Sequence, residues 1–192
     1  GGTISITAGT VTSTTQAEGG SAMVHGGRGQ SFTGGSISLV TGEGTATSSG
    51  HMVLRSVNSG ASGVSGSLYF STGTTSSGGS GSVSLFTGAA TNGEGGDVLV
   101  SVGKSKTDTG GDIYAIAGDS EPFTGGAISL TTGEGTDTSS GSFIVRTVNA
   151  GAAGVSGTMS FTTGTTSSGT SGMITVATGT ATNGKAGDML LS

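Results

Sequence analysis

The chain has no cysteine, a single proline and few aromatic or charged residues, and each of these shortages excludes a class of protein. Without cysteine, no disulfide framework can hold its 192 residues together. Proline is nearly absent and glycine does not recur at every third position, so the chain is not a collagen. No run of about 18 apolar residues occurs, so the sequence predicts no membrane span. The six basic residues and the net charge of −5 also argue against nucleic-acid binding.

Glycine is what the chain has in excess, with 42 residues of 192. Chains rich in glycine and serine are usually disordered, because they bury too little apolar surface to offset the entropy of the chain. Here, however, the apolar residues gather in short runs such as Ile37–Leu39 and Val83–Phe86. These runs return at a fixed interval, which favours an ordered repeat over a linker.

The repeat unit is about fifteen residues long and follows the pattern Gly-x-Φ-x-Φ-x-Thr-Gly, where Φ is apolar, with a small polar segment after it. Unit starts are 15 residues apart, except for two steps of 16 and a longer first unit from Gly2 to Gly20, for which we expect a bulge or a wider turn. A second period of 91 residues brings Phe32-Thr33-Gly34-Gly35 back as Phe123-Thr124-Gly125-Gly126. We interpret this as a duplicated block of six units, with the chain divided roughly into 1–34, 35–125 and 126–192, and we expect it to be part of a longer array.

The alternation of apolar and small residues predicts a strand with one buried face in each unit. A lone unit cannot bury that face, whereas stacked units can, with backbone hydrogen bonds between neighbours about 4.8 Å apart. The sequence therefore predicts an all-β fold: one parallel β-solenoid of about twelve coils over 1–192. Two units with small inward residues also carry Phe32 and Phe123, and we expect both rings to point inward and fill the vacant space.

No constellation of residues indicates an enzyme. His25 and His51 have no acid or nucleophile at a recognisable spacing, and the short turns leave little room for a cleft, so we expect neither catalysis nor a small-molecule substrate. The segment 92–100 is similar to a calcium-binding nonapeptide, but the chain steps by fifteen residues rather than nine. Glu94, Asp97 and Asp112 are weak candidates for a calcium site, because stacking would bring the two aspartates together. The primary expectation is that no cofactor or metal is bound.

The outward-facing strand positions carry large apolar residues where a free rod would be expected to be polar. Such a surface indicates packing against another copy or another fibre subunit, although scattered apolar residues on a surface are common. The candidate interface residues are Met23, Val53, Tyr69, Phe86, Leu99, Tyr114, Ile116 and Ile144.

The whole chain, with its glycine-, serine- and threonine-rich units, resembles the tandem-repeat β-solenoids of large secreted fibre and adhesin-type surface proteins. That resemblance implies an extracellular or cell-surface location and a structural role as fibre or filament, and it carries no functional residue across. The chain is also similar to some antifreeze β-solenoids, so ice binding by a threonine-rich face is an alternative. In the expected register the regular threonine column, for example Thr41 and Thr72, points inward rather than outward. A calcium-stabilised adhesin stalk is a second alternative.

Overall fold

The computed structural model describes residues 2–12 and 18–191. It divides the chain into two units, Gly1–Val98 and Leu99–Ser192, and each is described by itself. The bulge or wider turn expected in the longer first repeat falls largely on residues 13–17, which lie outside the described residues.

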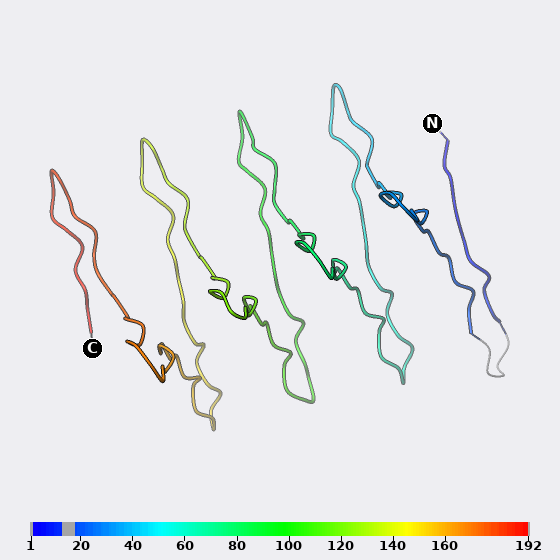
Figure 1. Ribbon diagram of the computed structural model, residues 1–192. Coiled ribbons are helices and arrows are strands. Elements are labelled where there is room, and N and C mark those ends of the chain that lie inside the picture. The colour runs from blue at the N-terminus through cyan, green and yellow to red at the C-terminus, as the bar shows by residue number, and fades with distance from the viewer. Residues whose placement is uncertain (1, 13–17, 192) are drawn as a thin grey trace. The chain divides into compact units, whose positions relative to one another are not determined.

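The prediction of a β-solenoid is wrong: among the described residues there is no strand and no helix, and the chain is largely coil. Figure 1 accordingly draws a plain trace without arrows or coiled ribbons. Alternation of apolar residues identifies the two faces of an extended segment, but a strand also requires a neighbour about 4.8 Å away to share its backbone hydrogen bonds. The described backbone shows no such ladder between successive apolar runs.

The fifteen-residue repeat is nevertheless present in the local geometry. From Gly20 onward, one short bend or turn falls in each unit, on the polar segment that follows the apolar run. The step between these bends is 15 residues, except for two steps of 16, from 45 to 61 and from 136 to 152, in the same two units that are longer in the sequence. The bends begin at Gln30, Thr45, Ala61, Ser76, Thr91, Lys106, Glu121, Thr136, Ala152, Ser167 and Thr182.

Paired glycines close several of the loops that carry these bends. The N–H group of Gly50 donates to the carbonyl of Gly42 at 3.0 Å, and Gly141 donates to Gly133 at the same distance one block later. Equivalent bonds join Gly35 to Gly27 at 2.8 Å and Gly126 to Gly118 at 2.9 Å. Six backbone hydrogen bonds of this kind are found in the described chain, and all of them connect two glycines within one loop.

Two of these closures need glycine because the two backbones approach closely. A Cβ atom added at Gly35 would lie 3.0 Å from the Gly27 nitrogen, and one added at Gly20 would lie 2.8 Å from the Gly9 nitrogen. Where the bond is absent, a side chain closes the loop: a Cβ at Gly81 or Gly172 would lie 3.4 Å from the Cγ2 methyl of the threonine nine residues earlier. The threonine column of the repeat therefore lies beside the first glycine of the next unit.

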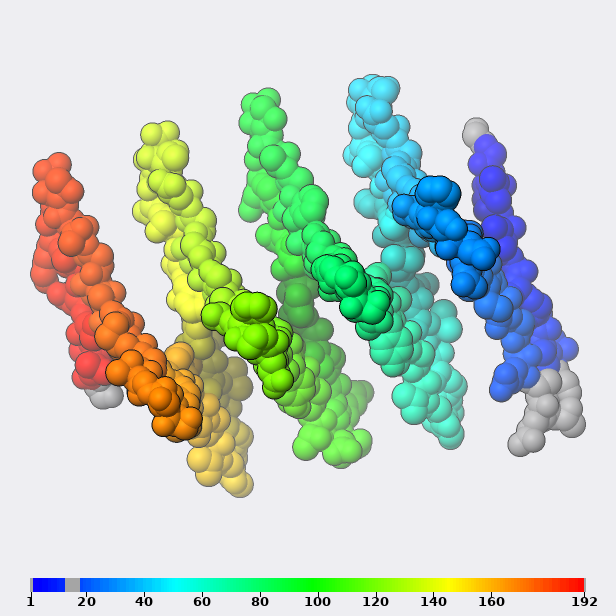
Figure 2. Space-filling view, viewed as in Figure 1, coloured from blue at the N-terminus to red at the C-terminus, as the bar shows by residue number. Residues whose placement is uncertain are grey.

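The described residues contain no buried side chain, hydrophobic or polar, and so no core. The large apolar side chains are between 43% and 96% exposed. The accessible surface sums to 19250 Å², whereas a compact monomer of 18.0 kDa would expose about 8000 Å². Figure 2 shows the same feature as slender segments of chain with no thick interior.

The predicted filling of the interior by two phenylalanines is also wrong. Phe32 is 91% exposed and Phe123 is 81% exposed. Both rings lie on bends, Gln30–Phe32 and Glu121–Phe123, rather than beside the apolar run of their own unit. The two rings therefore do not fill the space beside the small residues of their units. The register of inward and outward positions that this prediction assumed for the two units is wrong as well.

Candidate functional site

In several apolar runs the outward position is more accessible than the inward positions beside it. Val53 is 74% exposed, whereas its neighbours Met52 and Leu54 are 48% and 54% exposed. The central residue is also the most exposed of its three in the runs centred on Tyr69, Leu99 and Ile144. The alternation of the sequence thus sets which side chains are most accessible, even though no strand pairs with another.

All eight candidate interface residues are exposed to solvent in the structure. None of them lies in a hollow, and none is covered by another segment of the described chain. One of them makes a defined polar contact, since the Tyr114 hydroxyl donates to the Asp112 carboxylate at 2.8 Å. The eight are Met23, Val53, Tyr69, Phe86, Leu99, Tyr114, Ile116 and Ile144.

The weak calcium candidates are exposed acids that are divided between the two units of the chain. Glu94 and Asp97 belong to the first unit and Asp112 to the second, and all three are exposed. The stacking expected to bring the two aspartates together depended on paired strands, which the described chain lacks. No group of three or more His, Cys, Asp or Glu side chains that could hold a metal ion occurs in the searched part of the chain.

Two hollows in the structure were not identified from the sequence. One has a volume of about 280 Å³ and is lined by Arg55, Ser56, Val57 and Asn58. The other has a volume of about 470 Å³ and is lined by Arg146, Thr147, Val148 and Asn149. The second set of residues follows the first by 91 residues, so the hollow recurs with the six-unit block. That recurrence is the signal that could have identified it.

Polar contacts elsewhere stabilise the bends rather than a reactive centre. The Thr75 hydroxyl donates to the Ser77 carbonyl at 3.0 Å and accepts from the Ser77 N–H at 3.3 Å. Thr166 and Ser168 repeat both bonds at the same distances. The ion pair of Lys185 with Asp188, 3.1 Å long, lies in solvent, where such a pair contributes little to stability. None of these contacts resembles a nucleophile with its base.

Comparison with models of protein families, with curated proteins and with solved structures found no match to this chain. In the searched part of the chain, no helix has the length and apolar character needed to cross a lipid bilayer. The features of the molecule that bear on function are the repeat, the exposed apolar side chains and the two hollows.

Proposed function

We propose that the chain is a structural segment of an extracellular or cell-surface fibre, and that it gains its order by association with further copies. The observation that carries this proposal is the accessibility of its large apolar side chains, all at least 43% exposed in the described residues. Burying such side chains is the main favourable contribution to folding and association, at about 25 cal/mol per Å². A chain that leaves them all accessible retains this free energy for contacts with other molecules.

The repeat supports self-association over binding to an unrelated partner. Each unit presents an apolar run of the same kind, so two copies can meet through many equivalent contacts. Weak contacts that act together bind far more tightly than each does alone, provided that the geometry allows them to form at once. A repeating surface suits a fibre, in which the same contact is used along its length.

Electron microscopy of the native protein that contains this segment tests the proposal. We expect filaments or laterally associated fibres in which the segment lies in the continuous body. Dispersed single molecules at all protein concentrations would contradict the proposal, and an assay of ice recrystallisation would then be the next experiment.

A further inference from the structure

One hollow lies in each copy of the 91-residue block, so the two hollows recur with the repeat of the sequence. Arg55, Val57 and Asn58 line the first, and Arg146, Val148 and Asn149 line the second at equivalent positions. Only one position of the four differs, where Ser56 is replaced by Thr147, and both residues carry a hydroxyl. Two of the three arginines of the chain thus lie in equivalent hollows.

The side chains of each hollow suit a carboxylate. A guanidinium group offers several N–H donors in a planar fork that matches the two oxygens of a carboxylate, and an asparagine amide beside it adds further donors. Among the described residues, no acid lies within ion-pair distance of Arg55 or Arg146. Both guanidinium groups are therefore available to a carboxylate from another molecule.

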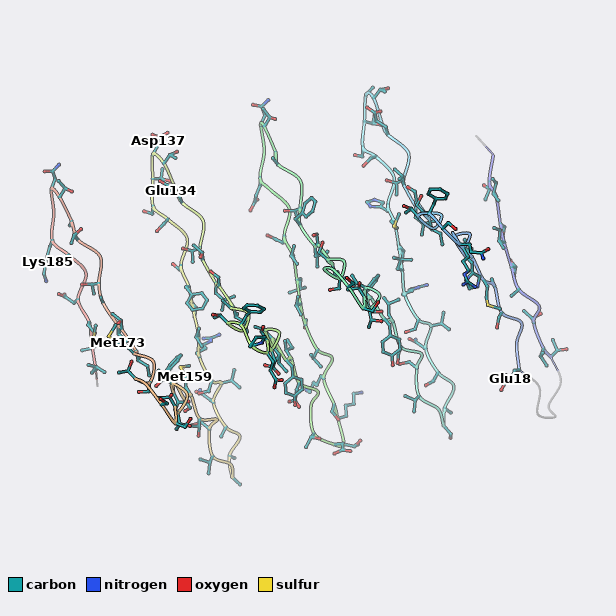
Figure 3. The ribbon with its side chains drawn as sticks, viewed as in Figure 1. Glu18, Glu134, Asp137, Met159, Met173 and Lys185 are labelled. Carbon is teal, nitrogen blue, oxygen red and sulfur yellow. The ribbon has the colours of Figure 1, made fainter. Side chains whose placement is uncertain are left out.

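The chain itself presents a matching acid in each block. Glu43 lies in the segment Thr41–Thr45, and Glu134 lies in its copy Thr132–Thr136. Neither glutamate forms an ion pair in the described chain, and both are exposed. Figure 3 shows Glu134 and Asp137 near the tip of a loop, where another molecule can reach them.

The arginines of the hollows and the two glutamates recur with the same period, which favours a second copy of the chain as the occupant of the hollows. Arg55 and Arg146 are 91 residues apart, and so are Glu43 and Glu134. Each block therefore carries one hollow and a glutamate of opposite charge at the same distance from it in the sequence, so a second copy offers the same partner to both hollows. Asp97 and Asp188 recur with the same period, but Asp188 already pairs with Lys185.

We propose that each arginine–asparagine hollow, Arg55–Asn58 and Arg146–Asn149, binds the carboxylate of Glu43 or Glu134 from a second copy of the chain. This inference rests on the proposed self-association and adds the contact that sets which segments meet. The apolar side chains contribute the attraction, and the charged pair selects the register.

Sedimentation velocity over a range of protein concentrations tests the inference with four proteins. These are the wild type, the variant R55E/R146E, the swapped variant R55E/R146E/E43R/E134R and the control R28E/K104E. The control makes the same change in net charge as the first variant but alters basic residues outside the hollows. The swapped variant restores the original net charge and the opposite signs at both contacts. Binding of each protein to polygalacturonate beads is measured in parallel.

We expect R55E/R146E to raise the dissociation constant for self-association at least about tenfold more than the control does, and the swapped variant to recover it. If the wild type associates and R55E/R146E behaves like the control, the inference is wrong while the proposed function stands. If R55E/R146E loses only its binding to polygalacturonate, the hollows are sites for acidic saccharides and the second copy is the wrong occupant. A wild type that stays monomeric throughout contradicts both proposals.

Discussion

Single glycines determine the shape of the bends in this chain. Gly78 has a φ of 102° and its copy Gly169 has a φ of 112°, values that side chains with a Cβ atom rarely adopt. Each follows directly after the serine that is bonded to the threonine of its bend, Thr75 or Thr166. The glycine and the hydroxyl contacts together define these two bends.

Replacing Gly78 by alanine tests this role without steric interference, because a Cβ atom there has no neighbour within 4 Å. We expect Gly78→Ala to disfavour the observed bend by about 1–2 kcal/mol, through backbone strain alone. In ¹H–¹⁵N spectra the amide signal of Ser77 should move toward its value in a variant that lacks the Thr75 hydroxyl. Gly79→Ala is the matched control, since Gly79 also has open space around it and has no positive φ. Equal changes in the two alanine variants would show that φ is unimportant here.

At the scale of the element, the described units are loops rather than strands, and backbone hydrogen bonds between two glycines close several of them. The sequence correctly indicated the unit length, the two longer units and the position of the polar turns, because these depend on neighbours along the chain. The predicted pairing of strands is wrong, because pairing depends on contacts between units: Ile37 and Leu39 alternate correctly, yet no neighbouring run bonds to theirs. Phe32 and Phe123 were misplaced for the same reason, since their expected position assumed a packed interior.

At the candidate site too, features set by neighbours along the chain could be predicted, whereas features set by the path of the backbone could not. Alternation identified Val53 and Leu99 as the most accessible residues of their runs, a local property. The concave shape at Arg55–Asn58 depends on the path of the backbone, which residue pattern alone does not supply. Only the exact recurrence of arginine and asparagine 91 residues later could have indicated it.

Loop closure can be tested at Gly44 and Gly135. A Cβ atom at these positions would collide with the carbonyl oxygens of Ser48 and Ser139, respectively. We expect Gly44→Ala to open the loop and weaken the bond from the Gly50 N–H to the Gly42 carbonyl, a loss of about 1 kcal/mol. The temperature coefficient of the Gly50 amide proton should then become more negative, as for an amide bonded to water.

Gly42→Ala provides the control for that experiment, because a Cβ atom at Gly42 meets nothing within 4 Å. This variant should leave the Gly50 amide proton nearly unchanged. The copy of the loop offers an independent repetition, with Gly135→Ala as the test, Gly133→Ala as the control and Gly141 as the reporter. A Gly50 amide that is insensitive to Gly44→Ala would mean that the collision is relieved without opening the loop.

At the scale of the whole molecule, the exposed apolar side chains form the surface through which we propose that copies of the chain associate. Leu99 is 87% exposed, and burying such a side chain fully contributes about 1.5–3 kcal/mol. We expect Leu99→Ser to weaken self-association about tenfold or more, as measured by sedimentation velocity. Ser84→Ala is the control at another outward position, and it should have little effect. Association that is unaffected by Leu99→Ser would remove this residue from the interface.

Hydrogen–deuterium exchange of the dilute, monomeric chain, compared with associated material, tests the central claim most directly. With no core and few backbone hydrogen bonds in the described residues, the amides of the apolar runs should exchange in the monomer at nearly unprotected rates. The same amides, for example those of Val83–Phe86, should become protected when copies associate. Strong protection of these runs in the dilute monomer would contradict the account, because it would show that a single chain forms its own hydrogen-bonded core.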